Sequence, residues 1–151
     1  MTELMAVIAL WLSTNFGLPH SFEYPRIEMV QPAQLVALRY KAFLGNAPRH
    51  MANAGSLQNQ REIVSVYDDT TRTIYLRSDW TGQDPAETSV LVHEMVHHLQ
   101  NLSGARFACT SAKEEMAFAA QDRWLGLFGH SLASDFGIDP FTQLASALCI
   151  H

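Results

Sequence analysis

Cysteine is scarce in this chain, and the scarcity limits what can hold the fold together. Only Cys109 and Cys149 occur among the 151 residues, which excludes a disulfide framework and allows at most one bridge. No C-x-x-C spacing accompanies them, so they do not form the cysteine pair of a metal site. The sequence leaves two alternatives open: one disulfide, or two reduced and buried thiols.

Positive charge is also scarce. The formal net charge is −5 at pH 7, and Lys and Arg form no cluster in the sequence. Nucleic acid and anionic membrane surfaces are therefore not expected as partners. The sequence does not indicate an oligomeric state.

Long apolar runs are missing as well. The longest one near the start, Leu4 to Leu12, has nine residues and is too short to cross a bilayer. The first basic residue is Arg26 and no small-x-small site follows the run, so it does not resemble a secretory signal. This slightly favours a cytoplasmic location and leaves a periplasmic or secreted one open. Helical spacing instead predicts an amphipathic core helix with an inner face of Leu4, Val7, Ile8, Trp11 and Leu12.

The apolar content is sufficient for one folded domain. Hydrophobic residues make up 48% of the chain, so 1–151 is predicted to be a single domain with a continuous core. Periodicity and turn residues predict an α+β fold in which helices pack on a small β-sheet or hairpin. The predicted helices are 4–12, 33–44, 85–103, 111–128 and 141–149, the predicted strands are 26–30, 63–67 and 73–77 with the last two in a hairpin, and 46–61 is predicted to be a long loop.

The most informative pattern is His93-Glu94-Met-Val-His97, an H-E-x-x-H motif. On a helix, residues four apart lie on the same face, so both histidines can direct a ring nitrogen at one Zn²⁺. Glu94 lies about 100° around the helix, close to where such an ion holds a water molecule. The motif predicts a metal site with Glu94 as its catalytic base.

The flanking sequence predicts that the motif is helical. Asp84-Pro85-Ala86-Glu87 has the pattern of a capping box with proline at the first helical position, and Gly104 stands where a helix would end. The alternative is structural: two core histidines whose nitrogens bond to backbone or carboxylate groups.

A catalytic zinc site needs a third protein ligand. The extended H-E-x-x-H-x-x-G-x-x-H pattern is excluded because Gln100 and Ser103 stand in place of its glycine and last histidine. Glu114 and Glu115 are the candidates one helix later. Helix phase favours Glu114, which shares a mostly apolar face with Ala117, and Glu115 is the less favoured alternative. Ser111-x-x-Glu114 also fits a capping box, in which Glu114 would only close the helix start.

At this point the sequence resembles the gluzincins, zinc peptidases in which a Glu ligand on the next helix, often within E-x-x-A, follows H-E-x-x-H. Here that segment is Glu114-Glu-Met-Ala117. More narrowly, residues 90 to 125 look like a family of small bacterial zincin-like proteins without an assigned function. The resemblance implies a minimal zincin-like fold and one catalytic Zn²⁺ bound by His93, His97 and Glu114.

The predicted function is that of a zinc-dependent hydrolase, a metallopeptidase acting on a peptide or protein substrate with Glu94 as general base. The alternative is a zinc-binding zincin-fold pseudoenzyme or regulatory module without proteolysis. By analogy with zincins, strand 73–77 is expected beside the site, where a peptide could add to its edge. Four residues are candidates for a transition-state donor, each with packing as its simpler explanation: His50, Tyr67, Tyr75 and His130. Asp122 is a candidate partner for a ligand histidine, and His98 is expected to pack or to hold a ligand in place.

Overall fold

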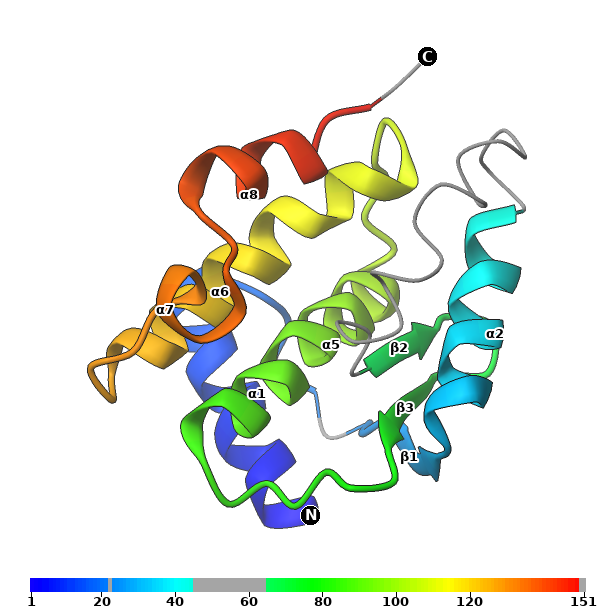
Figure 1. Ribbon diagram of the computed structural model, residues 1–151, viewed down its shortest axis with the longest axis horizontal. Coiled ribbons are helices and arrows are strands. Elements are labelled where there is room, and N and C mark those ends of the chain that lie inside the picture. Colours follow the sequence, from blue (N-terminus) through cyan, green and yellow to red (C-terminus); the bar gives the residue numbers. More distant parts are fainter. Residues whose placement is uncertain (22, 45–64, 150–151) are drawn as a thin grey trace. The chain divides into compact units, whose positions relative to one another are not determined.

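The structure is a computed structural model that describes residues 1–151 except 22, 45–64 and 150–151. Within the described residues it contains six α-helices, one 3₁₀-helix and a three-stranded mixed sheet (Figure 1), which confirms the predicted α+β class. The chain forms two compact units, one of Met1–Pro25 with Gly82–His151 and one of Arg26–Thr81. The assignment of 1–151 to a single domain stays a prediction.

The sheet belongs to the unit of residues 26–81. Its strands are β1 (Arg26–Val30), β2 (Ser65–Asp68) and β3 (Thr73–Arg77). β2 and β3 form the predicted antiparallel hairpin, in which Asp68 pairs with Thr73 and so belongs to the strand rather than to the loop. Residues 63–64 of the predicted strand and the whole of the predicted loop 46–61 lie outside the described residues.

The expectation of a free edge on strand 73–77 is wrong. The strand order is β1-β3-β2, so β3 is the central strand and pairs on both sides. β1 runs parallel to it, with Arg26 opposite Thr73 and Val30 opposite Arg77. A parallel pair needs a crossover, and helix α2 (Pro32–Leu44) lies in that connection and contacts β2 and β3. No peptide can add to β3.

The first helix of the other unit is α1 (Thr2–Phe16), longer than predicted at both ends. Its buried side is formed by Met5, Ile8, Ala9 and Leu12. Val7 is predicted on this side but is 58% exposed. The buried face of the helix is shifted by about one residue from the predicted face. None of the helices in the described part of the chain has the length and apolarity needed to span a membrane.

The motif lies on α5 (Pro85–Ser103), and both predicted helix ends are confirmed. Asp84 is the N-cap, and its side chain accepts a hydrogen bond of 2.8 Å from the backbone N–H of Glu87. At the other end Gly104 adopts a left-handed conformation with φ 68°, which costs glycine little.

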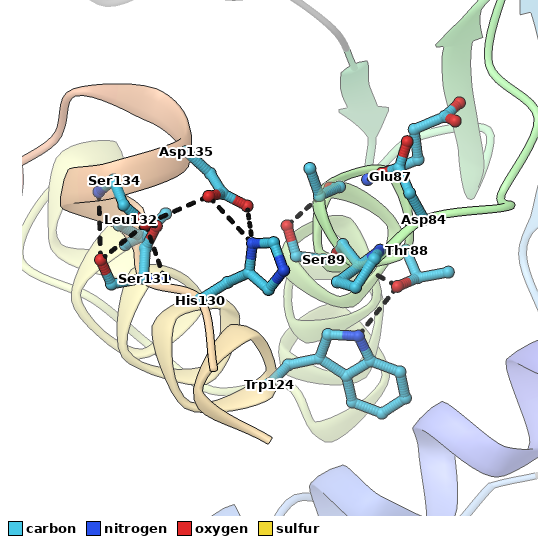
Figure 2. Close-up of polar contacts among 12 residues, drawn as sticks. Asp84, Glu87, Thr88, Ser89, Trp124, His130, Ser131, Leu132, Ser134 and Asp135 are labelled. Atoms are coloured by element: carbon cyan, nitrogen blue, oxygen red, sulfur yellow. Dashed lines mark hydrogen bonds and ion pairs between the residues drawn. The ribbon is translucent and has the colours of Figure 1, made fainter. Parts of the chain in front are cut away.

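The segment after α5 differs from the single predicted helix 111–128. It begins with a 3₁₀ turn, η1 (Thr110–Lys113), continues as α6 (Glu114–Gly126) and is followed by an unpredicted helix, α7 (Leu132–Phe136). A reciprocal capping box between Ser131 and Ser134 starts α7 (Figure 2). Five residues are too few to show helical periodicity in a sequence.

The last helix and the cysteines complete this unit. α8 (Pro140–Ser146) starts at Pro140, one residue before the predicted Phe141, and ends three residues before the predicted Cys149. Cys109 and Cys149 form a disulfide, which is the first of the two alternatives left open by the sequence. The bridge ties the end of the chain to the residue just before η1.

Candidate metal centre

Three side chains from two helices converge in the unit that contains α5 and α6. His93 and His97 come from α5, and Glu114 is the first residue of α6. Glu114 Oε2 lies 2.9 Å from His93 Nε2, and Glu114 Oε1 lies 3.1 Å from His97 Nε2. One ligand atom from each of the three residues lies within 4.8 Å of the other two. The carboxylate therefore faces both imidazole rings at once.

The local structure explains why these side chains meet. The histidines are four positions apart on α5, which places their rings on one helix face. α5 and α6 make the most extensive contact between described elements, and the buried Ala117 and Ala120 on α6 let the two helices approach closely. Glu114 is the first residue of α6, and its side chain lies beside the two histidines of α5.

The structure distinguishes between the two glutamates. Glu114 is partly buried against the histidines, whereas Glu115 is exposed. The capping-box alternative does not form, because Ser111 lies inside η1 rather than at a helix N-cap, and the backbone N–H of Glu114 bonds to the backbone carbonyl of Ser111. The helix-phase argument thus selected the residue that lies beside the histidines, and its role as a ligand stays a prediction.

Burial and charge act in opposite directions on the ionisation of this cluster. Burial alone would raise the pKa of Glu114, but the charge and hydrogen bond of His93, together with those of His97, hold the pKa well below its ordinary value. Burial would likewise lower the pKa of His97, but its hydrogen bond to Glu114 and the charges of Glu114 and Glu94 raise that pKa. Glu114 is therefore a carboxylate at neutral pH.

The cluster fits a zinc ion on two counts. Two imidazoles and one carboxylate form a typical catalytic donor set, and a tetrahedral zinc with bonds of about 2.0–2.1 Å separates its ligand atoms by about 3.3 Å, close to the observed 2.9 and 3.1 Å. In addition, Nε2 of each ring faces a carboxylate oxygen while Nδ1 faces a glutamine oxygen. Two arrangements satisfy these acceptors: an imidazolium with a proton on both nitrogens, or a neutral ring with its proton on Nδ1 and a cation between Nε2 and the carboxylate.

Glu94 lies next to this cluster and is almost fully buried, with 3% of its surface exposed. Its negative charge contributes to the raised pKa of His97, which places its carboxylate within electrostatic reach of that ring.

Two glutamines contact the histidines and were not predicted. Gln121 Oε1 lies 2.9 Å from His93 Nδ1, and Gln100 Oε1 lies 3.1 Å from His97 Nδ1. Asp122, the predicted partner, instead accepts a hydrogen bond from the backbone N–H of Leu132 at 2.9 Å, so that prediction is wrong. Helix phase could have suggested Gln121, because it lies on the same face of α6 as Glu114.

The other candidates lie in different surroundings. His98 Nε2 bonds to the backbone carbonyl of Glu23, which agrees with the expected packing role. His130 is 43% exposed and its Nδ1 contacts Asp135 at 2.9 Å (Figure 2). Tyr67 and Tyr75 lie on the sheet of the other unit, and His50 lies outside the described residues.

A family model matches most of this chain. The family described as Domain of unknown function (DUF6647) matches residues 1–137. The chain belongs to the DUF6647 family. No curated protein and no solved structure matches it. The DUF6647 match includes α5, η1 and α6, and with them all three residues of the cluster.

If the cluster of this DUF6647 chain binds zinc, its affinity is expected to fall as the pH falls. A proton and a metal ion compete for His97 Nε2, and the pKa of His97 is raised above its ordinary 6.5, so the proton competes already near neutral pH. Affinity should rise with pH and level off above the pKa of His97. Competition titration with a chromophoric chelator between about pH 5.5 and about pH 8.5 measures this; equal affinities at both ends would contradict it.

Proposed function

We propose that the protein is a zinc-dependent hydrolase, a metallopeptidase of gluzincin type that acts on a peptide or protein substrate. The observation that carries the proposal is the convergence of His93, His97 and Glu114, whose ligand atoms lie within 4.8 Å of one another. Two of these residues belong to an H-E-x-x-H helix and the third to the following helix, as in the family that the sequence resembles. Three protein ligands leave one position open for water or substrate.

Each residue has a distinct role in the proposed mechanism. His93 and His97 would hold the ion through Nε2, and Glu114 would hold it through its carboxylate. When bound, Zn²⁺ supplies a Lewis acid that polarises a carbonyl and lowers the pKa of a water molecule to about 7. Glu94 accepts the proton of the attacking water and returns it to the leaving amine.

Charge balance supports this assignment. Glu94 and Glu114 contribute two negative charges, and both histidines are neutral when they bind a metal. A divalent cation therefore compensates the two carboxylates in a largely buried place, where an uncompensated charge would be costly. Transfer of a proton to Glu94 during the reaction leaves the site with a net positive charge opposite the oxyanion that develops on the substrate.

The direct test is metal content together with metal-dependent hydrolysis. Tag-free protein is expected to contain about one zinc per chain by mass spectrometry and to cleave members of a random peptide library. A chelator should remove both the zinc and the activity, and added zinc should restore both. Protein without zinc would overturn the proposal, and zinc without cleavage would favour a binding or regulatory module.

A further inference from the structure

We propose that Gln100 and Gln121 are positioning residues that hold His97 and His93 in the tautomer with the proton on Nδ1. This leaves the lone pair of each Nε2 free for the metal. The inference rests on the proposed function and deepens it, because it names the residues that set the donor atoms of the site. Each glutamine is itself oriented by a group that can only accept its amide protons.

Gln121 is oriented through a chain of two hydrogen bonds. Its Nε2 donates to Ser89 Oγ at 3.2 Å, and Ser89 Oγ donates its own proton to the backbone carbonyl of Ala86 at 2.7 Å. Because the Ser89 proton is used in this way, Ser89 can only accept from Gln121. The amide oxygen of Gln121 must then face His93, so Nδ1 of His93 carries the proton.

Gln100 is oriented by a backbone group. Its Nε2 donates to the carbonyl of Lys113 at 3.3 Å, and a carbonyl oxygen cannot donate. The amide oxygen of Gln100 therefore faces His97 Nδ1, which must donate. Lys113 directly precedes Glu114, so Gln100 also connects the orientation of His97 to the backbone beside the third ligand.

Burial makes these contacts hard to replace. Gln100 and Gln121 are 4% and 5% exposed, so bulk water has little access to substitute for either amide. Each glutamine also connects α5 to the segment that follows it. Gln100 on α5 bonds to the backbone of Lys113 in η1. Gln121 on α6 bonds to His93 and Ser89 on α5. The amide oxygen of glutamine accepts a hydrogen bond from Nδ1–H as a carboxylate would, but it adds no negative charge to the site.

The test compares variants that remove the acceptor with one that keeps it. In Gln121→Leu and Gln100→Leu the ring loses its Nδ1 acceptor, and zinc affinity is expected to fall about 10- to 100-fold. Gln121→Glu retains an acceptor and should stay within about tenfold of the wild type. Ser89→Ala keeps Gln121 but frees its amide to rotate, so its loss should be smaller than that of Gln121→Leu.

Thr88→Val is the matched control. Trp124 Nε1 donates to Thr88 Oγ1 at 2.9 Å, another side-chain bond between α5 and α6 (Figure 2). Its loss should lower the thermal stability of the protein without changing zinc affinity. The control distinguishes an effect of weaker contact between α5 and α6 from an effect on the histidine rings. Thr88 is suitable because it is next to Ser89 on α5.

The second measurement is the ¹⁵N spectrum of the histidine rings in zinc-loaded protein. The wild type is expected to show metal-bound Nε2 and protonated Nδ1 for His93 and His97, with slow exchange of the Nδ1 proton. Exchange at His93 should accelerate in Gln121→Leu and stay slow in Thr88→Val. The inference is overturned if zinc binds through Nδ1, if both leucine variants keep wild-type affinity, or if the wild type binds no zinc. Zinc binding that depends on the glutamines, with no peptide cleavage, would support the inference while contradicting the proposed hydrolase.

Discussion

Glu94→Gln is expected to reduce peptide hydrolysis by about 10²- to 10⁴-fold while leaving zinc content unchanged. Glutamine has nearly the same shape as glutamate but cannot take a proton from water at neutral pH. Glu94 is almost fully buried and acts electrostatically on His97, but it is not part of the His93, His97 and Glu114 cluster. The change therefore removes the proposed base and spares the proposed ligands.

The measurement is kcat/KM for a cleaved peptide, beside zinc content of the same preparation. Glu87→Gln provides the matched control, because it makes the same chemical change about two turns earlier on α5 and should leave both values unchanged. Turnover of Glu94→Gln at the wild-type rate would contradict the proposed mechanism. Loss of zinc from this variant would instead assign Glu94 to metal binding.

Glu114→Ala is expected to weaken zinc binding by more than about 100-fold, whereas Glu115→Ala should have no effect. Removal of a residue that only orients a ligand costs about 10- to 100-fold, so removal of the ligand itself should cost more. The alanine variant also leaves His93 and His97 without the carboxylate that lies 2.9 and 3.1 Å from them. Glu115 is exposed and is the adjacent residue of the same type.

Zinc affinity is measured by competition titration, with circular dichroism and thermal unfolding on each variant. If Glu114→Ala does not fold, Glu114→Gln keeps the shape of the side chain and removes its charge, and it should still lose affinity. Equal zinc binding by the wild type and both alanine variants would exclude Glu114 as a ligand. Loss of zinc only from Glu115→Ala would assign the ligand to the residue that the structure leaves exposed.

Features set by neighbouring residues could be predicted from the sequence. Asp84 and Gly104 marked both ends of α5, since a helix end depends on the few residues around it. The spacing of His93 and His97, and the phase of Glu114 relative to Ala117, depend only on helix geometry. These local rules were sufficient to bring the three residues of the cluster together.

Features that depend on contacts between distant segments could not be predicted. The parallel pairing of β1 with β3 joins residues far apart in the chain, and no sequence period indicates which strand lies next to which. The contacts of Gln100 and Gln121 depend on side-chain directions across two helices. The position of Asp122 in the sequence suggested a partner for a ligand histidine. In the structure its carboxylate instead accepts a hydrogen bond from the backbone N–H of Leu132 at the start of α7.

The disulfide between Cys109 and Cys149 encloses α6, α7 and α8 in one covalent loop of the chain, since the two cysteines are 40 positions apart. Cleavage of any single peptide bond within that loop would not separate the protein into two molecules. The fragment that carries His93 and His97 would remain joined through the disulfide to the piece that follows the cut and contains Cys149. Only reduction of the bridge, in addition to the cut, would release the C-terminal piece.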